Sequence, residues 1–270
     1  MPELPEVETI KNELSPSVIG RKIMKVDIVR DDVISKPSAD EFREKVTGKT
    51  ITGITRRGKY LFFHLDKSDD ILTMHLKLAG SLQLDPETDK FTRAVLHLDD
   101  GTDVHLKDPR KFGRMWLEKD ESAVADRLGP EPFDKDFTVK TLAEILKKRS
   151  SPVKVVILDQ SLIAGIGNMY ADEALFEAKI HPARPAKRLS PAEVERLYDA
   201  IKNVLRKGIE KKGASVRDYF RPSGEKGEAH TDFLVAHGAG NSCPGCAGKI
   251  ERIVVGGRGT YICPRCQPEP

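Results

Sequence analysis

The sequence predicts an α+β protein in which strands and helices occupy separate parts of the chain. Short runs of alternating apolar and polar residues fill residues 22–117, whereas helical periodicity dominates residues 140–213. All four cysteines lie together near the C-terminal end. These three observations indicate a β-rich N-terminal part, a helical middle part and a small cysteine-bearing module.

Length and composition are compatible with this division. The 270 residues are enough for two or three compact domains, and 39% hydrophobic with 32% charged residues is typical of a soluble globular protein. No run of about 18 apolar residues and no signal pattern occurs, so we expect a cytoplasmic protein with no membrane partner. Residues 1–130 hold 22 basic and 24 acidic side chains, and residues 131–270 hold 23 and 18, which favours an anionic partner for the second half.

We expect three domains, because charged residues and Gly-Pro and Glu-Pro steps (GPEPFDKDF) interrupt the patterning from residue 129. Their predicted bounds are 1–130, 131–235 and 236–270.

The chain begins MPELPEVETI, and residues 5–14 predict a short helix with apolar residues on one side. Pro2 has two interpretations. It could belong only to a helix start, where proline and glutamate are favoured. Because a small second residue permits removal of Met1, Pro2 could also become a free terminal amine.

Seven alternating runs predict strands, and turn-like breaks separate several of them. Their regular spacing predicts an antiparallel sandwich or barrel. The runs cover residues 22–29, 50–55, 59–65, 72–84, 93–98, 103–106 and 114–117.

Four helices are predicted after residue 138, at 140–148, 151–160, 168–178 and 190–213. The last carries the clearest start signal, with Ser190 as N-cap and Glu193 closing a capping box. Residues 213–242 show little periodicity and predict a long, partly mobile loop.

Two CxxC pairs, separated by sixteen residues, predict a metal site formed by Cys243, Cys246, Cys263 and Cys266. The alternating residues between them can form a hairpin that brings the pairs together around one tetrahedral zinc ion. Two disulfides are the alternative, although these are rare in cytosolic proteins. Four thiolates leave no open ligand position, so such a zinc would be structural. The GGRG turn at 256–259 would project Arg258, either as a solvated side chain or as a phosphate contact.

The motifs MPELPEVETI, GIGNMYADE and CxxC-x16-CxxC, in this order, resemble the formamidopyrimidine-DNA glycosylases, over essentially the whole chain. This resemblance implies an N-terminal β-sandwich with a leading helix, a helix–two-turns–helix domain and a C-terminal zinc-finger hairpin. It implies a bifunctional enzyme that removes 8-oxoguanine and ring-opened purines from double-stranded DNA and then cuts the strand. One structural Zn²⁺ and a monomeric state are expected.

The resemblance also assigns roles to individual residues. Pro2 would be the nucleophile, Glu3 would transfer protons, and Lys59 and Arg258 would complete the catalytic set by gripping phosphates beside the lesion. Glu6 would support the site. Five further residues would contact DNA or fill the gap left by the extruded base: His75, Arg110, Phe112, Lys154 and Asn168. Leu78 would be the third gap-filling residue, in place of the methionine usual in the family.

Other segments depart from the family. Residues 214–230 retain RDY and GEKG but lack the aromatic-rich run that usually follows, and His237-Gly238 stands where a Tyr-Gly pair is frequent. Two other functions stay open: an endonuclease VIII-like glycosylase for oxidised pyrimidines, and a zinc-finger protein that binds damaged DNA without catalysis. The PELPEVE and DPRKFG motifs favour the purine-specific branch.

Overall fold

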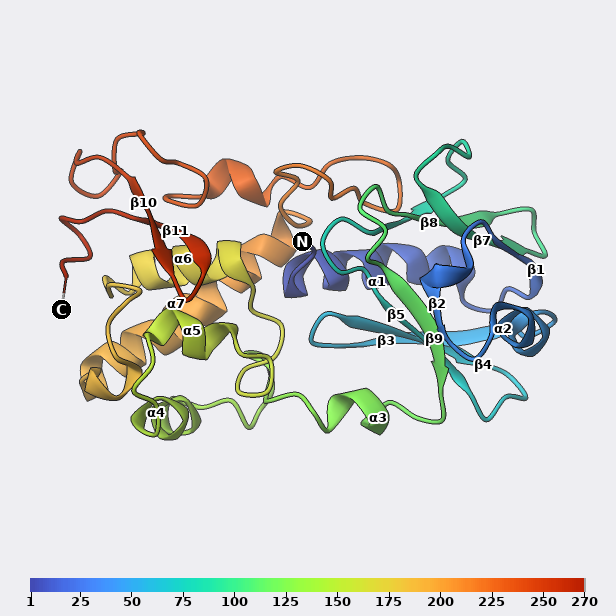
Figure 1. The fold of residues 1–270 in the computed structure, drawn as a ribbon, viewed down its shortest axis with the longest axis horizontal. Helices are drawn as coiled ribbons and strands as arrows, with labels where there is room; N and C mark the ends of the chain where they lie inside the picture. Colours follow the sequence, from blue (N-terminus) through green and yellow to red (C-terminus); the bar gives the residue numbers. More distant parts are fainter. Residues whose placement is uncertain (270) are drawn as a thin grey trace. The chain divides into compact units, whose positions relative to one another are not determined.

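The computed structural model describes residues 1–269, which form two compact units (Figure 1). The first unit comprises Met1–Arg127 and Gly208–His230, and the second comprises Leu128–Lys207 and the chain from Thr231 onward. Within the described range, every helix is too short or too polar to cross a membrane. The domain bounds at 130 and 235 stay predictions.

Two β-sheets make up most of the first unit. A four-stranded sheet has the order β1-β7-β8-β6, and a five-stranded sheet has the order β2-β9-β5-β4-β3. The strand bounds are β1 Ile23–Ile28, β2 Ile34–Lys36, β3 Ile51–Arg57, β4 Tyr60–Leu65, β5 Ile71–His75, β6 Ser81–Leu84, β7 Thr92–Leu98, β8 Asp103–Lys107 and β9 Arg114–Glu118. All neighbours are antiparallel except β2 and β9.

A single hydrophobic core joins both sheets to helix α1 (Leu4–Val18). Val7, Ile10 and Leu14 line the buried side of α1, while strands of both sheets contribute residues such as Leu96 and Phe63. The two sheets therefore form a sandwich rather than a barrel, and the predicted sandwich with a leading helix is confirmed.

The strand predictions fail in two places. The run 72–84 contains two strands, because residues 76–80 turn back with Lys77 at a φ of 53°. The turn has no glycine or proline before Gly80, so the pattern looks continuous. Strand β2 and helix α2 (Ala39–Val46) were not predicted, since both lie in a charged stretch with weak periodicity.

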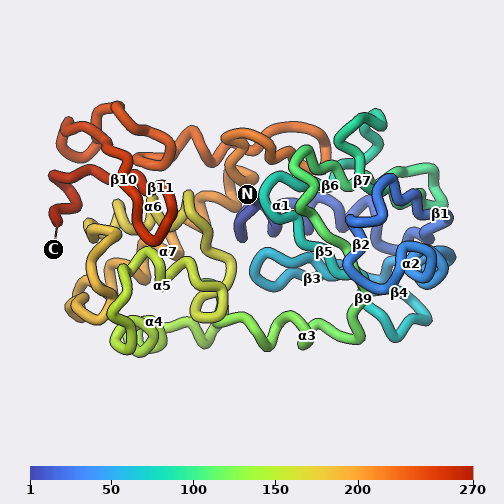
Figure 2. The backbone as a smooth tube through the Cα atoms, viewed as in Figure 1, coloured from blue at the N-terminus to red at the C-terminus, as the bar shows by residue number. Residues whose placement is uncertain are grey.

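The stretch Gly208–His230, orange in the backbone tube of Figure 2, belongs to the first unit and is bonded to the rest of that unit at several points. Within it, Ala214 and Glu228 form an isolated antiparallel bridge, which closes the segment between them into a loop. The carbonyl of Pro222 accepts a hydrogen bond from Leu84 N on the edge strand β6 at 2.8 Å. Arg221 forms an ion pair with Glu13 of α1 at 2.7 Å. The predicted loop is thus irregular, as expected, but fixed by specific bonds.

Helices dominate the second unit, at bounds close to those predicted. Its own hydrophobic core contains residues from all four main helices, including Leu146, Ile157, Leu175 and Leu197. Ser190 and Glu193 form the predicted capping box, with Ser190 N donating to Glu193 Oε2 at 2.8 Å. The bounds are α4 Val139–Lys147, α5 Val153–Leu158, α6 Asn168–Glu177 and α7 Pro191–Glu210, and a short helix, α3 (Ser122–Ala125), belongs to the first unit.

The cysteine-bearing module is a hairpin of β10 (Glu251–Val255) and β11 (Arg258–Ile262). Gly256 and Gly257 form its two-residue turn with φ values of 56° and 75°. Positive φ at both central positions is what a two-residue type I′ hairpin turn requires. A Cβ on Gly256 would also lie 2.4 Å from Val155 Cγ2, so α5 and the turn approach as closely as glycine allows.

Candidate functional site

The N-terminal segment is built into the first turn of α1. Pro2 and Glu3 are buried, and Glu3 is the N-cap residue of the helix. Glu3 and Glu6 form a reciprocal capping box, in which Glu3 N donates to Glu6 Oε2 at 2.7 Å. The other oxygen of Glu6 accepts Ala214 N at 2.8 Å. One buried carboxylate therefore connects the candidate catalytic terminus to the segment that begins at Ala214.

Lys59 lies in the tight turn between β3 and β4 and is 6% exposed. Arg56 fixes this turn to α1, because its Nε pairs with Glu8 at 2.7 Å and its NH1 donates to Gly58 O at 2.9 Å. The positive field of Lys59 reaches His75, whose strand neighbour is Tyr60. The structure thus gathers the Lys59 turn, the His75 strand end and α1 in one unit.

His75 is held as a neutral ring. Burial, with the nearby charges of Lys77 and Lys59, lowers the pKa of His75 to about 3. Its Nδ1 accepts Lys77 N at 2.9 Å, so the ring proton belongs on Nε2. The bond also fixes the turn that presents Leu78, which is 36% exposed.

Arg110 and Phe112 occupy the tip of a short loop between β8 and β9. Both are exposed, and the Arg110 guanidinium lies 5.8 Å from the centroid of the Phe112 ring. Phe112 therefore lies at a loop tip and not in the core of the sandwich. The carboxylate of Asp108 accepts three backbone N–H groups of this loop. Sequence reasoning missed Asp108, although an aspartate two residues before an arginine in a Pro-containing turn is a recognised signal for such bonds.

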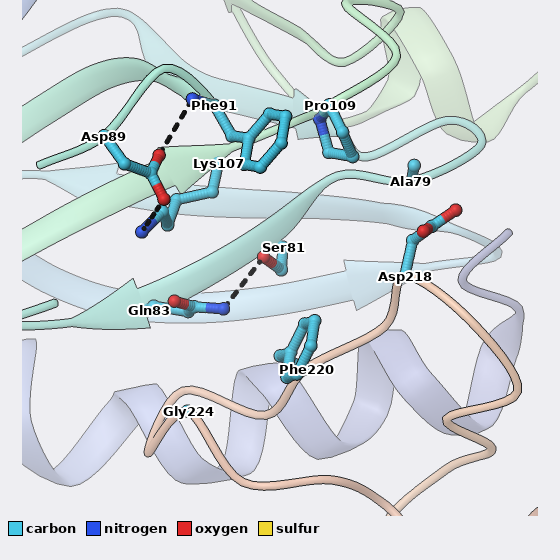
Figure 3. A pocket seen from close by; sticks show the side chains of 10 residues that line it. All are labelled: Ala79, Ser81, Gln83, Asp89, Phe91, Lys107, Pro109, Asp218, Phe220 and Gly224. Carbon is cyan, nitrogen blue, oxygen red and sulfur yellow. Dashed lines mark hydrogen bonds and ion pairs between the residues drawn. The ribbon is translucent and has the colours of Figure 1, made fainter. Parts of the chain in front are cut away.

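A pocket of about 400 Å³ opens beside the base of this loop, at Pro109, between the four-stranded sheet and residues 218–224 (Figure 3). The rings of Phe91 and Phe220 lie on opposite sides of it. Ser81 and Gln83 are hydrogen-bonded to each other along one wall, and Lys107 is paired with Asp89 at 2.9 Å. Its other lining residues are Ala79, Pro109, Asp218 and Gly224.

In the second unit, the structure does not place Lys154 on the surface. Its side chain has no exposed area, and Nζ binds Asp172 Oδ1 at 2.6 Å and Thr260 Oγ1 at 2.8 Å. Burial raises the pKa of Asp172 to about 7, although its pairing with Lys154 opposes that rise. The expected DNA contact of Lys154 would need this internal network to break. The ammonium instead joins α5 and α6 to strand β11.

Asn168 begins α6, but its side chain does not cap the helix. Nδ2 donates to Gly259 O at 3.0 Å, directly beside Arg258. Arg258 itself is exposed at the start of β11. The two residues predicted to grip DNA from this part of the chain are therefore adjacent, and the Lys154 network supports the same hairpin.

The four cysteine sulfurs lie within 4.8 Å of one another and form no disulfide. Tetrahedral zinc with Zn–S bonds of about 2.3 Å separates its sulfurs by about 3.8 Å, which matches the 3.8 Å between Cys243 and Cys266. Burial raises the pKa of Cys243 and Cys266, whereas backbone N–H groups and neighbouring thiols lower the pKa of Cys263 to about 7. The donor set fits a zinc ion with no open position.

Family models cover most of the chain. They are described as the formamidopyrimidine-DNA glycosylase N-terminal domain over residues 1–115, the H2TH domain of the same enzyme over 128–219, and a zinc finger found in FPG and IleRS over 240–268. The formamidopyrimidine-DNA glycosylase of Symbiobacterium thermophilum is 43% identical over 100% of this chain and 90% of its own. The chain belongs to the formamidopyrimidine-DNA glycosylase family.

Solved structures of the family support the fold along the full length. A Lactococcus lactis FPG mutant in complex with Fapy-dG-containing DNA matches with a TM-score of 0.93 at 34% identity, covering 99% of this chain and 100% of that one. MutM (FPG) from Thermus thermophilus matches with a TM-score of 0.90 at 39% identity, with 100% of both chains covered. The glycosylase fold, with its sandwich, H2TH domain and zinc-finger module, is thereby confirmed.

Proposed function

We propose that this chain is a bifunctional base-excision repair enzyme that removes 8-oxoguanine and formamidopyrimidines from DNA and cuts the strand at the resulting abasic site. The observation that carries the proposal is the buried Pro2-Glu3 terminus at the start of α1, in a chain that belongs to the glycosylase family throughout. Other members named in solved structures are bound to Fapy-dG-containing or abasic-site-containing DNA.

The nucleophile is the amine of Pro2 after Met1 has been removed. Its lone pair forms a bond to C1′ of the damaged nucleotide, and the glycosidic electron pair leaves with the base. Opening of the sugar then gives an iminium, which is positive without an added proton because the amine is secondary. This charge acidifies the C2′ proton, so that β-elimination and then δ-elimination break the strand. The positive end of α1 favours the neutral, nucleophilic form of the amine.

Glu3 moves the protons in this scheme. It follows the nucleophile directly and can protonate the sugar ring oxygen as the ring opens, then accept a proton during elimination. Its place in the capping box with Glu6 keeps the carboxylate at the helix N-terminus. Glu6 itself holds the backbone of this segment and is assigned no proton transfer.

Lys59 and His75 hold the DNA backbone next to the reacting sugar. The Lys59 ammonium supplies charge, and the neutral His75 ring offers an Nε2–H donor that does not depend on pH near neutrality. In the second unit, Arg258 and Asn168 hold further phosphates. Lys154 acts indirectly, by fixing the hairpin that carries Arg258.

Base removal requires the nucleotide to leave the stacked duplex. Arg110 then pairs with the orphaned cytosine, and Phe112 and Leu78 fill the gap. The pocket between Phe91 and Phe220 is of a size suited to small ligands and accepts the extruded base (Figure 3). The aromatic rings would stack on the base, while Ser81 and Gln83 offer hydrogen bonds to its edge.

One structural zinc ion is held by the four cysteines and supplies folding energy to the hairpin rather than chemistry. The enzyme acts as a monomer on double-stranded DNA, in the cytoplasm and associated with the nucleoid.

Borohydride trapping tests this function. The processed protein, mixed with a duplex that carries 8-oxoguanine opposite cytosine, should give a covalent complex in the presence of borohydride and an incised strand without it. A duplex with an oxidised pyrimidine serves as the comparison. Preferential trapping on that duplex would indicate the endonuclease VIII-like activity, and binding without trapping on either duplex would contradict a catalytic role.

A further inference from the structure

The loop that carries Arg110 and Phe112 has an unusual internal organisation. It is only a few residues long, yet it exposes 48% of Phe112 and holds Arg110 against the same ring. Exposed tips of this kind normally sample many conformations unless something inside the loop restrains them. Two side chains restrain the backbone of this loop: Arg114 NH1 donates to Lys111 O at 3.0 Å and to Gly113 O at 2.8 Å, and the Asp108 carboxylate accepts three of the loop's N–H groups.

Asp108 is 1% exposed, and both of its oxygens are used. Oδ1 accepts Arg110 N at 2.8 Å, while Oδ2 accepts Phe112 N and Gly113 N, each at 2.7 Å. Hydrogen bonds to an ionised acceptor are shorter and stronger than neutral ones. The backbone from 110 to 113 therefore wraps around a buried charge, with Lys111 in the left-handed region at a φ of 62°.

The backbone of Asp108 is itself fixed by two hydrogen bonds. Its N–H donates to Phe91 O at 2.8 Å, and its carbonyl accepts Arg93 Nε at 2.8 Å. Arg93 is 5% exposed and also donates to Lys90 O at 2.9 Å. A Cβ on Gly113 would come within 3.2 Å of Asp108 Oδ2, so the loop closes tightly on the carboxylate. The base of the loop is thus buried and bonded, and only its tip is exposed.

We propose that Asp108 is a positioning residue, which sets Arg110 and Phe112 in the geometry needed for insertion into DNA. The inference rests on the proposed function, since it assigns these two side chains to the gap left by the extruded base. Asp108 touches neither DNA nor the reacting atoms. Its effect should fall mainly on the choice of the opposite base, because paired hydrogen bonds to a base edge tolerate less displacement than contacts to phosphate.

Asp108→Asn tests the proposal with almost no change in volume. The amide group replaces one acceptor oxygen by a donor, so either the Arg110 bond or the pair to Phe112 and Gly113 is lost. We expect the ratio of kcat/KM for 8-oxoguanine opposite cytosine to that opposite adenine to fall about tenfold, toward the ratio of Arg110→Ala. Affinity for a duplex containing a tetrahydrofuran abasic analogue should change less than about threefold.

Asp120→Asn is the matched control. Asp120 Oδ1 accepts Ser122 N at 2.8 Å in a turn of the same unit that carries no candidate DNA contact. This variant should retain the wild-type ratio. If Asp108→Asn also retains it, the proposal is overturned. If Asp108→Asn does not fold, Gly113→Ala, which presses on Oδ2 without removing charge, should lower the ratio in the same direction, and an unchanged ratio there overturns the proposal too.

A binding measurement separates this inference from the proposed function. A tetrahydrofuran site opposite 2-aminopurine reports insertion of the tip through fluorescence, and no reaction takes place. Wild type should raise the fluorescence on binding, and Asp108→Asn should bind with a smaller rise. Failure of the wild type to excise any lesion would contradict the function alone, whereas equal fluorescence rises in the two proteins would contradict the role of Asp108.

Discussion

Acid should destabilise the first unit through His75, and replacing this residue should remove the effect. Burial and two neighbouring lysines lower the pKa of His75 from 6.5 to about 3. In the unfolded chain the ring binds a proton near pH 6.5, but in the folded chain it stays neutral. The unfolded state therefore binds more protons below pH 6.5, and stability falls as pH is lowered from about 6.5 toward about 3. Above pH 6.5 the group has no effect.

The size of the effect follows from the two pKa values. One pKa unit corresponds to about 1.4 kcal/mol, so at pH 5, which is about 1.5 units below the unfolded value, the loss is about 2 kcal/mol relative to pH 7. His75→Asn should not show it, because asparagine does not titrate. The amide oxygen can still accept Lys77 N, which preserves the turn. A smaller side chain beside Tyr60 will lower stability, but by the same amount at both pH values.

Urea unfolding followed by tryptophan fluorescence measures this directly. Trp116 is the sole tryptophan, lies in β9 of the first unit, and its ring is 6.1 Å from that of Tyr60. Wild type should lose about 2 kcal/mol more than His75→Asn between pH 7 and pH 5. Thr52→Asn, a change at an exposed position of β3 that adds or removes no titratable group, is the control and should behave as wild type. Equal losses in wild type and His75→Asn would refute the assignment of a neutral buried ring.

Three further predictions concern the Lys154–Asp172 ion pair, the zinc site and the Arg221–Glu13 ion pair. Lys154→Met should lower the free energy of unfolding of the second unit by about 3–5 kcal/mol, measured by urea unfolding with zinc release to a chromophoric chelator as the signal. Adding Asp172→Leu should recover most of that loss, because no unpaired charge then stays buried. A double variant no better than the single one would contradict an ion pair. Chelation of the zinc, or Cys263→Ser, should weaken DNA binding to a similar degree at every sequence tested, since the hairpin contributes phosphate contacts; unchanged affinity after verified loss of metal would argue against that role. Arg221→Met should speed limited proteolysis between residues 214 and 228, because the partly buried ion pair with Glu13 is lost. Arg217→Met, at an exposed position of the same segment, is the control. Equal proteolysis rates in the two variants would contradict a role of the Arg221–Glu13 ion pair in holding the segment.

The sequence predicted the parts of the fold that depend on local patterns. Alternation identified most strands of the sandwich, the capping box at Ser190 marked the start of α7, and cysteine spacing identified the metal site. Strand β2 was missed because it has only three residues and lies in a charged stretch, so alternation along the sequence could not identify it.

For the candidate site, too, local sequence patterns could not predict contacts between residues far apart in the chain. The resemblance to the family implied a DNA contact for Lys154, but its ammonium is buried and its acceptors lie 18 and 106 residues further along the chain. The link from Glu6 to Ala214 spans 208 residues. The resemblance to the family assigned roles to individual residues, whereas only the three-dimensional structure shows which of them hold others in place.

The chemical state of the first nitrogen is the most direct test of the central claim. Three forms of the protein should be compared on one 8-oxoguanine duplex: one that begins at Pro2 with a free amine, one that retains Met1, and one acetylated at Pro2. Borohydride trapping, read by mass spectrometry, should yield an adduct on the Pro2 nitrogen of the first form and none with the other two. Strand cleavage at equal rates by all three forms would contradict the account.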